Sequence, residues 1–477
     1  MRILFTIIFL FCLTSLFSQN LENSQYLGGP GFDKGHAILQ TNDGGYIITG
    51  VTDSSNGSKD ITVIRTDQWG LPLWSRGYGT AGWDEGNAII ETYDGNYVVT
   101  GFMTDTVNGG WDLAIVKINA TGDVLWTKTY GNGGMGFGNM NIGFDIKETS
   151  DSGYIVVGLT KNGTVPGKAN VFILRTNSIG DTLWTKMYGG STFSYGQAVE
   201  QTADGGFIIT GTTAMPGGGI LLLKISAIGD SLWARSYGEV SPSVFGGGYD
   251  IEIINNSEYL IAGWISLNGA RDVFLIKADS TGDTLWTKII GGNGEDEARS
   301  VKQTTDGGFI ITGLTNSFGA GDDDVYLIKT DSAGNITWTE TYGFVFDDIG
   351  ESVIQTSDGG LAIVGTSDRG SGDTQVWFMK IGLLSGINAI GNSATLVNVY
   401  PNPFTDYTNV RLGTGVIERY SDLRFEILDV IGKKVREISI VNSPEFQLYR
   451  KGMSSGLYFY RLNANSQVIE SGKIIVQ

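Results

Sequence analysis

The chain is poor in the residues on which most enzymes and metal proteins depend. Its 477 residues include one histidine, one cysteine and 8 prolines. A Ser–His–Asp triad would have to use His36, and no residue pattern around this histidine would orient it. Zinc sites built from Cys and His need several such ligands and are excluded. A disulfide is excluded as well, because Cys12 has no partner and lies in a segment that we expect to be removed.

The chain also lacks helical signals and positive charge. No segment has apolar residues at the period and over the length of a globular helix, which disfavours α/β folds. Lys and Arg number 32 against 50 Asp and Glu, a net charge of −18. Residues 19–396 hold 21 basic and 42 acidic residues, whereas residues 397–477 hold 10 and 8. This acidity argues against nucleic acid and anionic membranes as partners, and solubility is its simplest interpretation.

Glycine, by contrast, is abundant, with 71 residues, and much of it lies in a repeated stretch. Twelve residues similar to TTDGGFIITGLT occur seven times, 50 to 57 residues apart. The copies begin at Thr41, Thr92, Thr149, Thr202, Ile254, Thr304 and Thr356, and the copy from Ile254, INNSEYLIAGWI, departs most from the pattern. A fixed period in this range indicates a repeat architecture.

Each repeat contains four short strand signals. In the sixth they are Arg299–Thr304, Phe309–Gly313, Val325–Lys329 and Ile336–Thr339. The Asp-Gly-Gly before the second strand suits a tight hairpin turn, because glycine adopts positive φ without steric cost. Four antiparallel strands per repeat, arranged radially, make a β-propeller blade. The predicted fold is therefore all-β, a seven-bladed β-propeller with four-stranded antiparallel blades.

The seventh repeat lacks its fourth strand, and the N-terminal segment offers a replacement. A fourth-strand tryptophan recurs in the other repeats, at Trp74, Trp126, Trp184, Trp233, Trp286 and Trp338. The pattern stops after Lys380, whereas Ser24–Gly29 is similar to the ends of the fourth strands. We predict that this N-terminal strand pairs with Val376–Lys380 and closes the last blade, which leaves no long exposed sheet edge.

Both ends of the chain are expected to direct export. In residues 1–18, Arg2 precedes an apolar run and then small and polar residues, which is typical of a signal peptide and too short for a membrane span. We expect residues 19–386 to form the propeller, residues 387–396 a linker and residues 397–477 a last domain. Its strand signals alternate with period two and predict a small antiparallel, Ig-like β-sandwich. No transmembrane span is expected after signal removal.

Four motifs follow one another in this last domain. Their defining residues are Tyr400, Pro401, Asn402, Pro403, Gly432, Gly456, Tyr458, Gly472 and Lys473. In these motifs the domain resembles the C-terminal sorting domain of the type IX secretion system. The resemblance implies the type IX secretion machinery as a partner. It also implies a location outside the cell or on the outer-membrane surface, usually after cleavage of the tail.

The repeats resemble propeller families less specifically. Their Tyr-Gly-Gly, Asp-Gly and Thr-Gly elements are similar to a bacterial β-propeller repeat family, which implies a fold and no single activity. The pattern Lys-x-Asp-x-x-Gly-x-x-x-Trp is similar to quinoprotein dehydrogenases, which hold a calcium-bound quinone over the ring axis. Many of those enzymes have a neighbouring cysteine pair that is absent here. Blade geometry alone accounts for the pattern if the Trp fills space between blades.

Binding residues are expected on one face of the disc. The second-to-third-strand loops and the blade-to-blade loops share this face and are long and varied, whereas the other turns are short and uniform. Function concentrates on variable loops held by a rigid scaffold. The aromatic candidates for contact with a sugar ring or a protein are Trp83, Trp111, Phe137, Tyr195, Phe245, Tyr249, Phe318 and Phe346.

Charged residues give two further expectations. The acidic loops offer weak calcium candidates at Asp296, Asp322, Asp323 and Asp348, because calcium prefers oxygen ligands, although solvated turn residues are the simpler interpretation. A basic residue ends every third strand, from Arg65 to Lys380. We expect it to pair with the residue two positions later in most repeats, rather than to join a ring that binds a polyanion.

Taken together, these patterns favour a binding or adhesion module for a glycan or protein partner. No catalytic residue and no required cofactor are assigned, and calcium is an option. One alternative is a polysaccharide-degrading enzyme, which would need Asp or Glu pairs converging at the axis. Another is a quinone-dependent dehydrogenase.

Overall fold

The structure is a computed structural model of the chain. It describes residues 20–53, 57–131, 140–161, 168–189, 193–213, 218–238, 245–255, 257–266, 269–382, 397–400, 404–412, 423–428, 433–440, 445–464 and 467–476. The chain divides into two compact units, Met1–Leu384 and Ser385–Gln477. The predicted signal peptide and linker lie outside the described residues.

All elements in the described part of the chain are strands, and most belong to four-stranded antiparallel sheets. Four such sheets are β2 Lys34–Gln40, β3 Tyr46–Asp53, β4 Lys59–Thr66 and β5 Pro72–Tyr78; β14 Ser194–Gln201, β15 Phe207–Thr213, β16 Gly219–Ile225 and β17 Ser231–Tyr237; β18 Phe245–Ile254, β19 Glu258–Ser266, β20 Arg271–Ala278 and β21 Thr284–Ile290; β22 Asp296–Gln303, β23 Phe309–Thr315, β24 Asp324–Thr330 and β25 Ile336–Tyr342.

Two further sets of four are joined into one eight-stranded sheet by a single parallel pair, Met140 with Trp111. They are β6 Glu85–Glu91, β7 Tyr97–Thr104, β8 Trp111–Ile118 and β9 Val124–Tyr130, then β10 Met140–Glu148, β11 Tyr154–Lys161, β12 Asn170–Thr176 and β13 Thr182–Tyr188. The last sheet of the unit contains β26 Asp348–Gln355, β27 Leu361–Asp368, β28 Thr374–Gly382 and β1 Asn20–Leu27.

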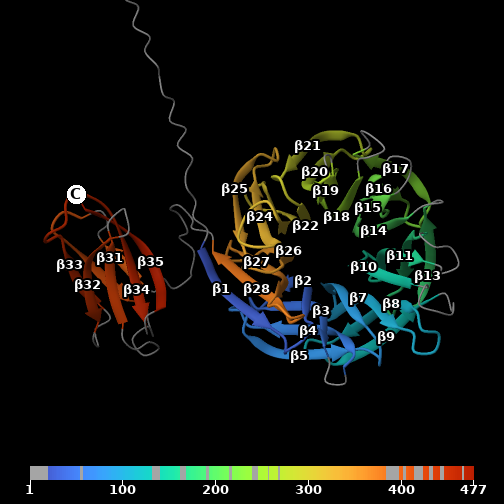
Figure 1. Cartoon of the computed structure of the whole chain (residues 1–477), viewed down its shortest axis with the longest axis horizontal. Helices are drawn as coiled ribbons and strands as arrows, with labels where there is room; N and C mark the ends of the chain where they lie inside the picture. Colours follow the sequence, from blue (N-terminus) through green and yellow to red (C-terminus); the bar gives the residue numbers. More distant parts are fainter. Residues whose placement is uncertain are drawn as a thin grey trace, which may run out of the picture. The chain divides into compact units, whose positions relative to one another are not determined.

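The sheets stand side by side around a central opening, with the first strand of each nearest to it (Figure 1). The last sheet lies beside the first. The Thr374 amide donates to the Gly31 carbonyl at 2.8 Å, and the Ser357 amide donates to Gln40 Oε1 at 2.7 Å. These bonds join residues more than 300 positions apart, so the succession of sheets returns to its start.

The predicted pairing of the N-terminal strand is confirmed. β1 runs antiparallel to β28, with Leu27 opposite Val376 and Ser24 opposite Met379. The Trp377 indole donates to Ser24 Oγ at 2.7 Å, and its ring stacks on Tyr26 at a centroid distance of 5.9 Å. Pairing across this length of chain leaves no free edge on β28.

Five of the six fourth-strand tryptophans pack on a glycine of the next sheet, as the space-filling interpretation predicts. The Trp74 ring lies against Gly122 in the turn between β8 and β9, where φ is +84° and a β-carbon would meet the ring at 3.0 Å. The other pairs of this kind are Trp126 with Gly180, Trp184 with Gly229, Trp233 with Gly282 and Trp286 with Gly334. Close packing between sheets therefore requires glycine in these turns.

A tyrosine hydroxyl fastens the same turns. Tyr78 Oη and Tyr237 Oη each donate at 2.6 Å to the carbonyl of the glycine on which the preceding tryptophan packs. In the sixth repeat the Tyr342 hydroxyl is buried without a partner among the described residues. The last sheet takes its fourth strand from the N-terminus, so no turn joins its third and fourth strands. The carbonyl that accepts the tyrosine hydrogen bond in other repeats therefore has no counterpart there.

The basic residues that end the third strands do pair locally, but the predicted partner was wrong. Six of them contact an aspartate of the turn before the second strand, and Lys277 contacts Glu258 at the start of β19. The pairs are Arg65–Asp43, Lys117–Asp94, Arg175–Asp151, Lys224–Asp204, Lys277–Glu258, Lys329–Asp306 and Lys380–Asp358. The cation side chains are mostly buried, which removes them as a polyanion-binding ring. Hairpin pairing places the turn before the second strand and the turn after the third strand at the same end of each sheet. Distance along the sequence alone does not reveal that these two turns are neighbours.

The second unit contains two antiparallel sheets. One holds β29 Val397–Tyr400, β30 Tyr407–Leu412 and β33 Glu445–Tyr449, and the other holds β32 Lys434–Ile440, β31 Leu423–Leu428, β34 Gly456–Ala464 and β35 Gln467–Val476. Side chains of both sheets, among them Val410, Phe425 and Leu448, share one core. Among the described residues of the chain, no helix is long and apolar enough to cross a membrane.

Candidate functional site

The first strand of every repeat carries a β-bulge at the same place. The register against the second strand shifts there, and one residue is left unpaired. We call these half-buried residues the axial ring: His36, Asn87, Phe144, Gln197, Tyr249, Arg299 and Glu351. A bulge re-aims its side chain and is common beside functional sites. Unlike the repeated turn motif, this position differs in every repeat, as expected of a site presented by a uniform scaffold.

Residues of the axial ring interact with residues of nearby sheets. The charge of Arg299 and the hydroxyl of Tyr195 influence one another, although β18–β21 lie between their strands along the chain. Arg299 also interacts with Glu351 of the next repeat and lies 4.3 Å from the Tyr249 ring centroid. Burial raises the pKa of Tyr249, so this phenol remains protonated at neutral pH. The axial end of these strands is therefore a polar cluster built from several sheets.

The only histidine belongs to this cluster. His36 Nε2 lies 2.9 Å from Glu85 Oε1, and the Trp83 indole donates to the other oxygen of Glu85 at 3.0 Å. Burial lowers the pKa of His36, but the hydrogen bond and charge of Glu85, with the charge of Glu351, raise it above its ordinary value overall. Glu85 thus orients the imidazole, a contact that sequence reasoning missed.

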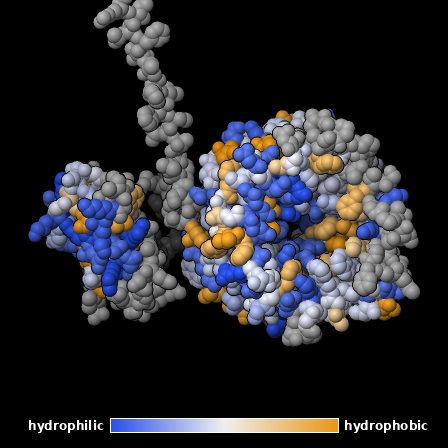
Figure 2. Space-filling model, viewed as in Figure 1, coloured by the Kyte–Doolittle hydropathy of each residue, from blue (hydrophilic) through white to orange (hydrophobic). Residues whose placement is uncertain are grey.

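A cavity of about 620 Å³ opens beside the axial ring, at the sheets β18–β21 and β22–β25. Figure 2 shows the central opening, with hydrophilic and hydrophobic residues both at its edge. The cavity is lined by Phe245, Trp264, Ser266, Gly269, Arg271, Glu295, Glu297, Arg299, Leu314, Asp323 and Ile349. Its volume lies within the range of small-ligand pockets, roughly 300–1,000 Å³.

Two arginines in this wall are fixed by Glu297. The Arg271 guanidinium donates to Glu297 Oε1, and Arg299 Nη2 lies 2.9 Å from Glu297 Oε2. Glu297 itself is only 3% exposed. The Arg271 guanidinium also stacks over the Trp264 ring at 4.3 Å. Ion pairing and stacking together hold the planar donors in one orientation.

Glycines in the fifth repeat make room for this arrangement. At the position that Glu297 occupies in the sixth repeat, the fifth has Gly247. A β-carbon at Gly247 would meet the Trp264 indole nitrogen at 2.8 Å. Trp264 therefore fits only because the facing side chain is absent. The sequence already marks this position, because the copy that begins at Ile254 departs most from the repeat pattern. In that copy Trp264 follows Ala-Gly.

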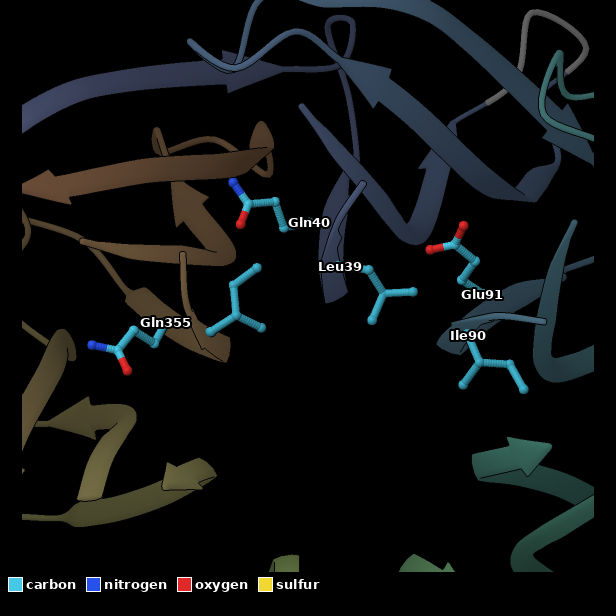
Figure 3. A pocket seen from close by; sticks show the side chains of 6 residues that line it. Leu39, Gln40, Ile90, Glu91 and Gln355 are labelled. Atoms are coloured by element: carbon cyan, nitrogen blue, oxygen red, sulfur yellow. The ribbon is translucent and has the colours of Figure 1, made fainter. Parts of the chain in front are cut away.

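A second cavity, of about 380 Å³, lies further along the same first strands. Leu39, Ile90 and Ile354 enter it from three neighbouring sheets, together with Gln40, Glu91 and Gln355 (Figure 3). The equivalent positions of the other repeats carry Lys147, Glu200, Glu252 and Lys302, which form ion pairs across neighbouring strands. The amides of Gln40 and Gln355 are already bonded to turns of the preceding sheets. This end of the opening is thus occupied by structural contacts.

The aromatic candidates do not form one patch. Trp83 and Trp111 pack together at 5.6 Å, Tyr195 packs with Phe193 at 5.4 Å, and Tyr249 belongs to the axial ring. Of the seven that the structure describes, Phe245 alone lines the larger cavity, and it is 57% exposed. Phe318 and Phe346 are exposed on loops outside that lining. Phe137 lies outside the described residues.

The calcium candidates serve chiefly as anchors for loops. Asp296 is fully buried and accepts from the Gly292 amide at 2.8 Å and from Ser317 Oγ at 2.6 Å. Asp348, equally buried, accepts from the Phe344 amide at 2.8 Å. Asp322 is exposed, and Asp323 lines the larger cavity. Within the described ranges, no three carboxylate, imidazole or thiol groups lie close enough to hold a metal ion.

Residues 398–477 match the model of the secretion system C-terminal sorting domain. The second unit is a sorting domain of this family. Of its predicted motif residues, Tyr400, Gly456, Tyr458, Gly472 and Lys473 lie in strands, and Pro401, Asn402, Pro403 and Gly432 lie outside the described residues. The protein is accordingly exported by the type IX system to the cell surface or the extracellular space.

None of the curated proteins matches the sequence. Among solved structures, the chain is similar to the extracellular domain of a hybrid two component system from B. thetaiotaomicron, with 10% identity, a TM-score of 0.46 and coverage of 97% of this chain and 59% of that one. Drosophila Semaphorin 2a has 9% identity, a TM-score of 0.46 and coverage of 96% and 98%. Puromycin hydrolase has 10% identity, a TM-score of 0.45 and coverage of 80% and 59%. These similarities are too distant to indicate an activity.

Proposed function

We propose that the first unit is a seven-bladed β-propeller that binds a glycan at the cell surface or outside the cell. Seven sequence repeats, the radial sheets of Figure 1 and the pairing of β1 with β28 support the blade count. The proposal also retains the Ig-like assignment of the second unit, on its two sheets around one core. Export through the sorting domain agrees with a role in contact with the surroundings of the cell.

The cavity beside the axial ring carries the binding proposal. It combines an exposed aromatic ring, Phe245, with guanidinium and carboxylate groups held in place, one of them by the Trp264 ring. Small-ligand sites are built this way, from apolar walls with a few oriented polar groups. Preorganisation favours affinity because little side-chain freedom is lost on binding.

The arginine contacts of the carboxylates in this cavity favour binding over hydrolysis. Glycosidases use two carboxyl groups, one on each side of the scissile bond. Glu297 contacts a guanidinium group with each oxygen, and Glu295 lies beside Arg271. Of the three carboxylates in the described lining, this leaves only Asp323 without an arginine partner, whereas hydrolysis needs a pair. The polysaccharide-degrading and quinone-dependent alternatives therefore take second place in this proposal.

A glycan array probed with the mature protein tests the function. We expect signal on a subset of glycans and at least about a tenfold loss of affinity in Phe245→Ala and in Arg271→Ala, a loss of about 1.4 kcal/mol. Phe346→Ala is the matched control, because Phe346 is a similarly exposed loop phenylalanine outside the cavity lining. Absence of glycan binding, or equal effects of all three changes, would refute the proposed site.

Deletion of Val397–Gln477 separates sorting from folding. We expect the truncated chain to fold and to stay inside the cell envelope, because the described strands of the first unit pair only with one another. Cell fractionation with detection of both forms measures this. Full-length levels of the truncated protein in the medium would contradict it.

A further inference from the structure

We infer that the cavity beside the axial ring selects neutral, hydroxyl-rich sugars and rejects acidic ones such as uronates and sulfated sugars. This inference rests on the proposed glycan-binding function and adds the class of ligand. It is carried by the charges of the lining, by the mixture of donors and acceptors, and by the apolar part of the wall.

The positive charges of the cavity are already balanced. Two cations, Arg271 and Arg299, line it together with three carboxylates. Glu297 contacts both guanidinium groups, and Glu295 Oε2 lies 3.6 Å from Arg271 Nε. An anionic ligand would therefore find no unpaired positive charge. Removing its hydration shell would cost free energy that the site does not return.

Two of the carboxylates would also repel an anion. Glu295 is about half exposed and Asp323 is partly exposed at the cavity. Burial raises the pKa of Asp323, and the charges of Asp347 and Glu297 raise it further, which reflects the density of negative charge on this side. Like charges placed against a ligand are how a site rejects it.

The charged groups of the lining are of two kinds. Guanidinium groups only donate hydrogen bonds, and ionised carboxylates only accept them. A hydroxyl does both. Neighbouring hydroxyls of a sugar can accept from Arg271 and donate to Glu295 or Asp323 at the same time. A carboxylate or sulfate ligand can bond only to the arginines, and an ammonium ligand can bond only to the carboxylates. Either ligand therefore leaves the other kind of charged group without a partner.

The remaining wall suits the apolar face of a sugar ring. Phe245, Leu314 and Ile349 line the cavity without polar side-chain atoms. Phe245 is 57% exposed at the start of β18, whereas the Trp264 face is occupied by Arg271. Contact with the C–H face of a sugar is therefore expected at Phe245, with Trp264 as the support of Arg271.

Paired oligosaccharides test the inference. We would measure affinity of the full mature protein for a neutral oligosaccharide found on the array and for the same oligosaccharide oxidised at C6 to the uronate, by calorimetry at low and high salt. We expect the uronate to bind at least about tenfold more weakly, and neutral binding to change little with salt. Uronate binding that equals or exceeds neutral binding would overturn the inference and leave the proposed function standing.

Variants assign any discrimination to the lining. Glu295→Gln with Asp323→Asn removes both exposed charges and keeps the side-chain shapes, so we expect it to restore much of the uronate affinity. Phe245→Ala should weaken both ligands equally. Discrimination that survives Glu295→Gln with Asp323→Asn would overturn the charge argument. Binding of a protein with no glycan binding would overturn both this inference and the proposed glycan function.

Discussion

The exchange Asp306→Asn should destabilise the first unit through Lys329. Lys329 Nζ lies 2.9 Å from Asp306 Oδ2 and donates to the Thr330 carbonyl at 2.9 Å, and its side chain is 10% exposed. Asparagine keeps an oxygen for the bond from the Gly308 amide, 3.0 Å long in the structure. The change therefore removes the negative charge and little else.

The size of the effect follows from the unequal burial of the two partners. Exposed ion pairs are worth about 0.2–1 kcal/mol, whereas removal of one partner of a fully buried pair costs about 3–5 kcal/mol. Here the cation is buried and the carboxylate is 64% exposed. Allowing for solvent screening of the carboxylate, we expect a coupling free energy of about 1–2 kcal/mol.

A double-mutant cycle with Lys329→Met measures this coupling. Urea unfolding of the mature protein can be followed by tryptophan fluorescence, because all 11 tryptophans lie in the first unit and the sorting domain has none. Asp331→Asn is the control. Asp331 lies two positions after Lys329 and accepts from the Asn335 amide at 2.8 Å. A coupling below about 0.5 kcal/mol for Asp306, or a larger one for Asp331, would refute the reasoning.

Three other predictions concern orientation, packing and closure. By NMR titration, His36 should have a pKa above its ordinary value, and Glu85→Gln should lower that pKa. Because the pKa is raised in the folded state, the pair stabilises the fold at acidic pH, and this contribution is lost as the pH rises through the folded pKa. A His36 pKa that Glu85→Gln leaves unchanged would contradict the pairing. Gly229→Ala should lower the melting temperature more than Gly205→Ala, because both have positive φ but only Gly229 has a neighbouring side chain within 3 Å of the new β-carbon; equal losses would argue against packing between sheets. Deletion of residues 19–30 removes all of β1 and should cause cooperative loss of stability in thermal unfolding, and an unchanged melting temperature would show that the strand is dispensable.

The sequence by itself determined the repeated strand order, the N-terminal closing strand and the route of export. These features are carried by local patterns, since turn glycines, alternating strands and sorting motifs act over a few residues each. Even the partner of β1 could be predicted, because Ser24–Gly29 has the pattern of a fourth strand and the last repeat lacks one. The strand β31, Leu423–Leu428, begins with the alternation of buried and more exposed residues that the period-two pattern of the last domain predicts.

Only the tertiary structure decided which side chains meet. Lys329 precedes Asp331 by two positions but pairs with Asp306, because two hairpins bring their turns to the same end of the sheet. The axial ring depends on bulges that a strand pattern does not reveal, and Arg299 lies over the Tyr249 ring only because neighbouring sheets stand side by side around an opening. The cavity arises where Gly247 leaves room for Trp264. The missing side chain at Gly247 creates this space only because strand pairing places Trp264 opposite it.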